Sequence, residues 1–193
     1  HGAYPHLAID PIPIAAQLVN ALQTVVSRFT SPNDSVVFSI TKIHAGDAYN
    51  VRPESARLSG TVRTFSMDQM RQIEAQVQDL AQSTAAAFGA SAALDFKVPF
   101  HPVVNDEATT AFAGEVCASI AGDGNVLRTG APGTGSEDFS FMAEQVPSCY
   151  LIIGNGEDSN ALHNPGYDFN DDAIVYGGSF FARVTEQELV GVR

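Results

Sequence analysis

The sequence lacks the features that mark several classes of protein. Only two of its 193 residues are cysteines, and they form no CxxC motif. No apolar run approaches the roughly 18 residues that a membrane-spanning helix needs. The GxSxG, HExxH, P-loop and GxGxxG motifs are also absent. These absences argue against a disulfide-stabilised scaffold, a membrane-spanning protein, and the hydrolase and nucleotide-binding classes that these motifs mark.

Basic residues are scarce, and their distribution divides the chain. The formal net charge is −12; residues 1–101 carry seven Lys/Arg and eight Asp/Glu, whereas residues 102–193 carry three and fourteen. The acidic second part would repel a phosphate backbone, which argues against nucleic acid as a partner. The change in charge also suggests a domain boundary near residue 100. The acidic part is either a solubilising surface or a region that lies close to cations.

The first part of the chain has the pattern of an α/β domain. Apolar spacing and start signals predict, in order, a helix, two strands, a helix and a third strand, over residues 11–29, 35–43, 56–65, 67–88 and 93–100. This order is that of a ferredoxin-like β-α-β-β-α-β domain that lacks its first strand. A sheet packed on two helices normally needs that strand, so we expect it to precede His1.

The second part contains fewer elements. A helix capped around Asn105 and ended by Gly122 is followed by a glycine-rich loop and a short helix in residues 136–146. The continuous apolar run CYLIIG, residues 149–154, predicts a strand buried on both faces. A long polar loop then leads to a final helix that begins near residues 170–172. With one strong strand, this part also resembles a portion of a larger α/β domain.

His163 is the first candidate for chemistry. It lies in the stretch ALHNPGYDF, in a loop after the expected buried strand, where α/β sheets usually place their ligands. Neutral imidazole is a common ligand of zinc-like ions. No partner ligands stand at a recognisable spacing from it. The residues alone therefore leave open a surface or structural histidine and a metal ligand.

Four further residues suggest the binding of negative charge. Arg63 lies on the polar face of strand 56–65 and Asn50 in the loop before it, so that together they suit a carboxylate. The alternative is a solvated arginine and a turn asparagine. His1 and His6 either donate to an oxyanion or have structural roles.

The loop GTGSEDF contains two acidic residues, Glu137 and Asp138. They are either an acidic pair at a helix start or catalytic acids. Two acids and no lysine follow the glycines, so phosphate binding is not expected.

Five stretches of the chain occur in the same order in one known family. They are HGAYPHLAIDPI, VSRFTSPNDSVV, AGDAYNVRPESARLSGTVRTF, GSEDFSFM and LHNPGYDFNDDAI. Across essentially its whole length the sequence resembles the metal-dependent aminoacylase, hippurate hydrolase and auxin-conjugate hydrolase family of two-metal amidohydrolases and peptidases. The resemblance implies that residues 1–101 are most of a lid and dimerisation domain. It implies that residues 102–193 are the C-terminal part of the α/β catalytic domain.

The resemblance also assigns roles within the lid. His1 matches a histidine that reaches into the partner subunit's active site and polarises the scissile carbonyl. Asn50 and Arg63 match residues that contact the carboxylate end of the substrate. The N-terminal half of such an enzyme supplies most metal ligands and a glutamate general base, and we expect that half to lie before His1.

In the second part, His163 matches the C-terminal metal ligand. Gly135, Ser136 and Glu137 match a loop that lines the substrate pocket. The loop departs from the family pattern at Thr134, where a methionine is common.

The implied reaction is the hydrolysis of an N-acyl amino acid, hippurate-like or a related amide or peptide, to a carboxylic acid and an amino acid. The implied cofactors are two divalent metal ions per subunit: zinc, manganese, cobalt or nickel. We expect a cytoplasmic homodimer, joined through the lid, with no nucleic-acid or membrane partner, and we expect the 193-residue chain alone to be inactive. The alternatives are a non-catalytic dimerisation or binding module and a metal-free degenerate homologue. The retention of Asn50, Arg63 and His163 in their motifs favours the enzyme.

Overall fold

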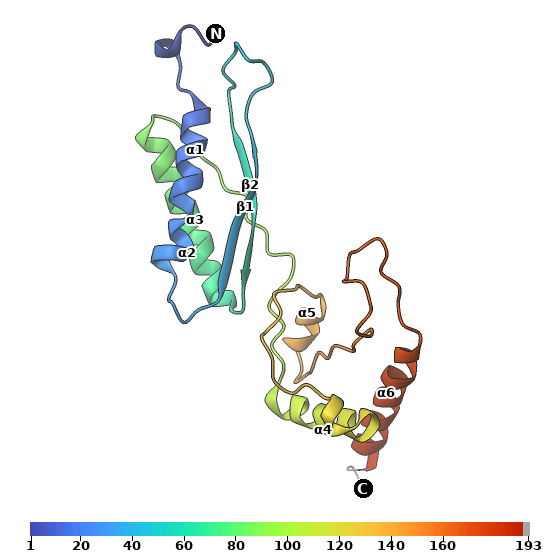
Figure 1. The fold of residues 1–193 in the computed structure, drawn as a ribbon. Coiled ribbons are helices and arrows are strands. Elements are labelled where there is room, and N and C mark those ends of the chain that lie inside the picture. Colours follow the sequence, from blue (N-terminus) through green and yellow to red (C-terminus); the bar gives the residue numbers. More distant parts are fainter. Residues whose placement is uncertain (191–193) are drawn as a thin grey trace. The chain divides into compact units, whose positions relative to one another are not determined.

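A computed structural model describes residues 1–190 of the chain, which divides into two compact units, His1–Pro102 and Val103–Arg193. The first unit contains η1 (Pro5–Leu7), α1 (Pro11–Leu22), α2 (Thr24–Phe29), β1 (Val36–His44), β2 (Arg57–Thr64) and α3 (Met67–Ala87) (Figure 1). The second contains α4 (Glu107–Ala121), η2 (Asp123–Asn125), α5 (Phe139–Ala143) and α6 (Asp172–Val190). The mixed α/β class expected from the sequence is confirmed.

The predicted first helix is present as two consecutive helices, α1 and α2. Asp10 begins α1 by accepting a hydrogen bond from the Ile12 N–H at 3.1 Å, and Pro11 follows at a position that needs no N–H donor. At Gln23 the N–H bonds to the Asn20 and Ala21 carbonyls instead of the carbonyl four residues back. The regular α-helical pattern is therefore interrupted between the two helices.

β1 and β2 form an antiparallel hairpin, as the alternation of apolar and polar residues predicts. Phe38 pairs with Val62, and the register shifts between Ile40 and Lys42. This β-bulge places one extra residue in β1. Apolar side chains of both strands face α2 and α3, so that the hairpin has one inner face and one outer face.

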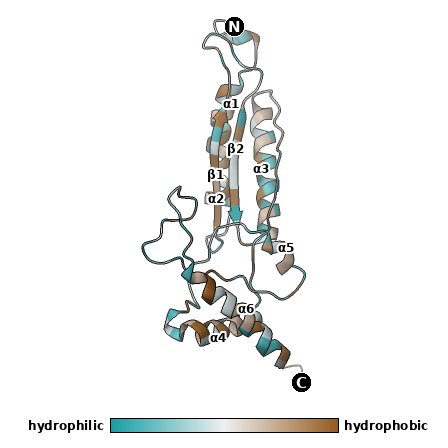
Figure 2. Cartoon of the chain, turned by 90° about the vertical axis from the view of Figure 1, so that its right-hand side faces the viewer, coloured by the Kyte–Doolittle hydropathy of each residue, from teal (hydrophilic) through white to brown (hydrophobic). Residues whose placement is uncertain are grey.

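The core of the first unit lies between its helices and the inner face of the hairpin (Figure 1 and Figure 2). Leu22 and Val25 meet Ile73 and Val77 of α3, and all four side chains are buried. Burial of each such side chain contributes about 1.5–3 kcal/mol relative to exposure. α3 itself begins as predicted, because Ser66 accepts a hydrogen bond from the helix backbone.

The predicted third strand, residues 93–100, is not a strand in the described part of the chain, where the sheet consists of β1 and β2. The alternation of the segment persists: Leu94, Phe96 and Val98 are half-buried, whereas Asp95 and Lys97 are exposed. In a β-α-β-β-α-β sheet the last strand pairs with the first. That pairing partner is not among residues 1–102, so the segment keeps its periodicity without a hydrogen-bonded ladder.

The second unit is built on two helices, α4 and α6, which pack together through small apolar side chains. Ala113 and Val116 of α4 and Ala173 of α6 are buried. Gly122 ends α4 as predicted, with a φ of +83° that an L side chain rarely adopts. Within residues 1–190, no helix combines the length and the apolar character needed to cross a membrane.

The predicted buried strand, residues 149–154, is also not a strand in the structure. Tyr150 instead pairs with one side chain: its N–H donates to Asn105 Oδ1 at 2.8 Å, and its carbonyl accepts from Asn105 Nδ2 at 3.0 Å. Ile152 is 89% exposed, so the prediction that residues 149–154 are buried on both faces is wrong for this unit taken by itself. An apolar run becomes a buried strand only beside other strands, and no strand is present in the described residues of this unit.

The two cysteines are free and half-buried, in agreement with the absence of a disulfide framework. Burial raises the pKa of the Cys117 thiol, and the nearby Cys149 raises it further. The thiol of Cys117 is therefore a packing group more than a reactive one.

Asp106 begins α4, one residue after the expected cap, and makes unfolding depend on pH. Its carboxylate accepts hydrogen bonds from the Thr109 N–H and hydroxyl, both at 2.8 Å, and these bonds lower its pKa from the ordinary value of 3.8. The stabilisation is full above the unfolded pKa and is lost as the pH falls through the lower folded pKa. We expect Asp106→Asn to lose less thermal stability between pH 5 and pH 2 than the unmodified chain. If the melting temperatures of the two chains fell by the same amount across this range, the role given to the Asp106 carboxylate would be wrong.

Candidate active site

The first unit brings His1 and Asn50 together at one end of the hairpin. The Gly2 N–H donates to the Asn50 carbonyl at 2.8 Å, which joins the N-terminal segment to the loop between β1 and β2. His1 Nδ1 accepts from the Ala3 N–H at 3.1 Å, and the ring centroid of His1 lies 5.8 Å from that of Tyr4. Two residues that the sequence places 49 positions apart therefore belong to one cluster.

Arg52 joins the same loop to residues 5–10 of the N-terminal segment, and sequence reasoning missed it. Its Nη1 donates to the Pro5 carbonyl at 3.2 Å and to the Ala8 carbonyl at 3.1 Å, while its Nε lies 3.5 Å from Asp10 Oδ2. The Arg52 side chain is only 13% exposed. The partners are backbone carbonyls more than 40 residues away, so no spacing rule in the sequence points to this contact.

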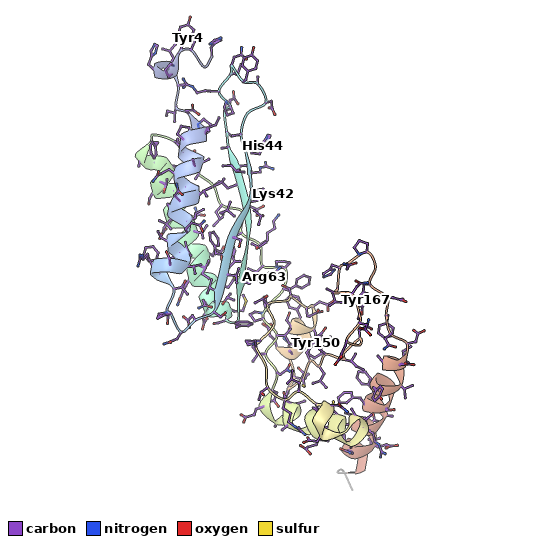
Figure 3. The ribbon with its side chains drawn as sticks, in the orientation of Figure 1. Tyr4, Lys42, His44, Arg63, Tyr150 and Tyr167 are labelled. Carbon is purple, nitrogen blue, oxygen red and sulfur yellow. The ribbon has the colours of Figure 1, made fainter. Side chains whose placement is uncertain are left out.

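Arg63 lies at the opposite end of the hairpin, opposite Val37 of β1. The six steps along the strand from Arg57 to Arg63 span about 20 Å at about 3.3 Å per residue. In Figure 3, Arg63 is labelled toward the end of the hairpin that lies away from Tyr4 of the N-terminal segment. Within one chain, Asn50 and Arg63 therefore do not converge on one carboxylate. Their individual roles as substrate contacts stay predictions.

The predicted pocket loop, with Gly135, Ser136 and Glu137, lies directly before α5. A Cβ at Gly135 would meet no atom within 4 Å, so this part of the loop is open within the described residues. The Glu137 carbonyl accepts from the Ser140 N–H at 3.3 Å and so begins the turn that leads into α5. The expected turn and short helix are confirmed, although Asp138 makes no side-chain capping bond.

The Tyr150 hydroxyl lies beside the Glu137 carboxylate. Partial burial raises the pKa of the Tyr150 hydroxyl, and the charge of Glu137 and its hydrogen bond with that hydroxyl raise it further. The ring of Phe139 lies 5.3 Å from the ring of Tyr150, which is labelled in Figure 3. Tyr150 is a second residue missed by sequence reasoning, because the apolar run around it predicts a buried strand position.

His163 lies in the exposed loop between residues 154 and 172. Its φ is +68°, and it is the only residue other than glycine with a positive φ in the described part of the chain. Its imidazole makes no hydrogen bond or ion pair with another of residues 1–190. An exposed and unengaged imidazole in an unusual backbone conformation fits one corner of a metal site.

Further metal ligands are not grouped with it. Among residues 1–190, no set of three or more His, Cys, Asp or Glu side chains is placed to hold a metal ion. The described residues therefore fit one ligand of a metal centre and do not complete a centre by themselves.

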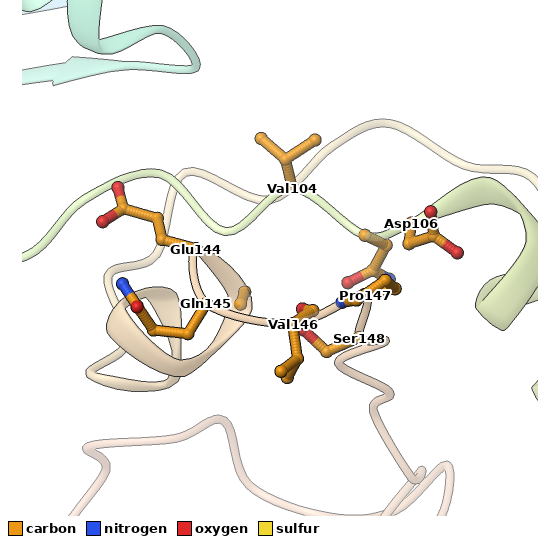
Figure 4. A pocket seen from close by; sticks show the side chains of 9 residues that line it. Val104, Asp106, Glu144, Gln145, Val146, Pro147 and Ser148 are labelled. Carbon is orange, nitrogen blue, oxygen red and sulfur yellow. Dashed lines mark hydrogen bonds between the residues drawn. The ribbon is translucent and has the colours of Figure 1, made fainter.

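An open pocket of about 310 Å³ lies in the second unit, lined by Val104, Asn105, Asp106 and residues 143–148 (Figure 4). None of the predicted site residues lines it. Its wall includes Asn105 and Asp106, whose side chains already bond Tyr150 and Thr109, so this pocket is not the candidate site.

Residues 14–187 match peptidase family M20/M25/M40. IAA-amino acid hydrolase ILR1-like 2 of Arabidopsis thaliana is 32% identical to the chain, over 98% of the chain and 44% of the relative. N-acetylcysteine deacetylase of Bacillus subtilis is 33% identical, over 95% of the chain and 47% of the relative. N-acetyldiaminopimelate deacetylase of Geobacillus thermodenitrificans is 36% identical, over 94% and 48%.

Solved structures agree with these relatives. The YXEP protein of Bacillus subtilis, described as a dinuclear metal binding peptidase from the M20 family, is 29% identical, with a TM-score of 0.70 over 90% of the chain and 45% of that protein. A tripeptidase from Staphylococcus aureus, 19% identical, shares the fold with a TM-score of 0.70. The chain thus spans about half the length of the relatives it matches. With nine-tenths of its residues inside the matched region, and with the five ordered motifs, the chain belongs to peptidase family M20/M25/M40.

Proposed function

We propose that the whole protein is a metal-dependent amidohydrolase that cleaves N-acyl amino acids to a carboxylic acid and an amino acid. The observation that carries the proposal is the similarity, over 94% or more of the chain, to proteins named as hydrolases of IAA-amino acids, N-acetylcysteine and N-acetyldiaminopimelate. These substrates share an amide between an acyl group and an amino acid. We keep hippurate-like amides within this substrate class.

Two divalent metal ions are the proposed cofactors, supported by the dinuclear description of the related YXEP protein. Bound ions of this kind activate water and polarise the amide carbonyl. His163 would hold one ion through its free imidazole. Zinc, manganese, cobalt and nickel all accept a neutral imidazole ligand, so the chemistry of His163 is compatible with each.

The remaining residues would bind and orient the substrate. His1, next to Asn50, offers donors to the carbonyl under attack, and Arg63 offers a charged fork to a carboxylate. Gly135, Ser136 and Glu137 would line the pocket, with Glu137 held by Tyr150. Because Asn50 and Arg63 of one chain lie at opposite ends of the hairpin, we propose that they serve different substrate groups or different active sites.

We further propose that residues 1–101 form the lid and residues 102–193 a part of the catalytic domain, and that the lid joins two subunits. The hairpin supports this proposal, since β1 and β2 each pair on one side only and leave the other edge of the strand open in the described residues. Such edges are ready templates for pairing with another chain. Two joined lids would bring a histidine of one subunit within reach of the other subunit's substrate.

The test is hydrolysis by the whole protein of N-acetyl and N-aroyl amino acids, before and after metal removal by a chelator. We expect turnover that disappears on chelation and returns on addition of zinc, manganese, cobalt or nickel. Turnover that persists without metal would contradict the proposed chemistry. Absence of both metal and turnover would instead favour the degenerate homologue or the binding module.

A further inference from the structure

Asparagine side chains close the loop that carries His163 with two sets of hydrogen bonds, one inside the other. We call these sets the outer tie and the inner tie. The outer tie is made by Asn155, whose Nδ2 donates to the Asp168 carbonyl and to Ser159 Oγ, both at 2.7 Å. Its Oδ1 accepts from the Asn170 N–H at 2.7 Å. One half-buried side chain therefore closes the base of the loop, from residue 155 to residue 170.

The inner tie is made by Asn160, whose Nδ2 donates to the Gly166 carbonyl at 2.7 Å. Inside it, Asn164 Oδ1 accepts from the Gly166 N–H at 2.8 Å. The Asn160 side chain lies close to the Gly166 backbone, because a Cβ at Gly166 would lie 3.1 Å from Asn160 Nδ2. The inner tie encloses His163 within seven residues.

His163 occupies a strained position at the tip. The Asn164 N–H donates to the Ala161 carbonyl at 3.1 Å, so that residues 161–164 form a turn with His163 in third place. A positive φ at the third place of a turn normally calls for glycine or asparagine. A left-handed conformation is uncommon for any residue other than glycine, and the two ties enclose this one.

We propose that Asn155 and Asn160 are positioning residues, which hold the His163 backbone in its left-handed conformation and so aim the imidazole at a divalent cation. This inference rests on the proposed function, because it takes His163 as a metal ligand. In this proposal neither asparagine would itself be a ligand of the ion. Outer-shell partners that orient a metal-binding histidine typically change metal affinity by about 10- to 100-fold when they are replaced.

The first readout is the backbone of His163 in the 193-residue chain, labelled at histidine and observed by NMR. A positive φ brings the N–H and Cα–H bonds to the same side, so the unmodified chain should show a strong NOE between these two protons of His163. We expect Asn155→Ala and Asn160→Ala each to weaken this NOE. The matched control is Asn125→Ala, which removes a comparable bond from Asn125 Nδ2 to the Ala121 carbonyl, 2.8 Å long and far from this loop in the sequence.

The second readout is Co²⁺ binding by the whole protein, followed by the visible spectrum of the ion and by competition with a chelator. We expect the Co²⁺ affinity to fall about 10- to 100-fold in both loop variants and to stay unchanged in Asn125→Ala. An unchanged NOE in both loop variants would overturn the proposal, and so would a lost NOE with unchanged affinity. A whole protein that binds no Co²⁺, Zn²⁺ or Mn²⁺ would overturn the proposed function and this inference together. In that case the NOE of His163 would still report whether Asn155 and Asn160 hold its backbone. A missing metal site would thus be distinguished from ties that do not shape the loop.

Discussion

Replacing Gly60 by alanine should lower the free energy of unfolding of the first unit by about 3 kcal/mol, the upper range for inserting a group into a packed site. Gly60 pairs with Ile40 at the bulge of the hairpin. A Cβ at Gly60 would overlap the Ser39 carbonyl oxygen and lie 3.1 Å from the Ser39 carbonyl carbon. Both atoms belong to the backbone of the paired strand, so no side chain can rotate to make room.

The consequence should be visible as a local loss of protection. For a unit of this size a loss of 3 kcal/mol corresponds to a fall in melting temperature of about 12 °C or more. Hydrogen exchange measured peptide by peptide would place the change in β1, β2 and α3 and not in α4 or α6. Ser59→Ala, one residue away on the exposed side of the same strand, should stay within about 0.5 kcal/mol of the unmodified chain. A Gly60→Ala chain as stable as the Ser59→Ala chain would show that the hairpin register is different from the one described.

The helices of this chain could be predicted because their start signals are local. Asp10 before Pro11, and Ser66 three residues before Gln69, act within one helical turn, and the structure contains the corresponding hydrogen bonds. The two strands of the hairpin could also be predicted from their alternation. The bulge could not, since it depends on Gly60 facing β1, which is a property of the pair of strands and not of either sequence alone.

The two strands that the sequence predicts wrongly fail for the same reason. Residues 93–100 keep their alternating burial and residues 149–154 keep their apolar composition, but neither segment has a strand beside it in the described residues. A strand needs a neighbouring segment for its backbone hydrogen bonds, whereas a capped helix makes nearly all of its backbone hydrogen bonds within one segment. Prediction from sequence was therefore sound for helices and incomplete for the sheet.

The candidate site divides in the same way. Motifs in the sequence pick out His1, Asn50 and His163, because each lies in a distinctive local stretch. The contacts that arrange them are non-local: Arg52 bonds carbonyls 44 and 47 residues away, and Asn155 bonds a residue 15 positions away. Such partners have no signature of their own in a single sequence.

Replacing His163 by alanine should have the largest effect on function. In the whole protein we expect the variant to lose metal and to lose at least about 100-fold in turnover of N-acyl amino acids, because even outer-shell residues of metal sites cost up to about 100-fold. The fold should be retained, since the His163 side chain is exposed and its ring makes no bond to residues 1–190 that alanine would break. Circular dichroism should therefore be unchanged while the metal content falls.

His44→Ala is the matched control for this variant. His44 is also an exposed histidine, and its Nε2 lies 3.8 Å from Asp47 Oδ1 in a surface pair that contributes little to stability. If imidazole content alone determined metal uptake, both variants would lose similar amounts of metal. If the left-handed turn makes His163 a ligand, only His163→Ala should lose metal and activity. Equal metal content in the two variants would instead show that His163 is not part of the proposed metal centre. The comparison thus separates a ligand placed by the fold from a histidine that happens to be accessible.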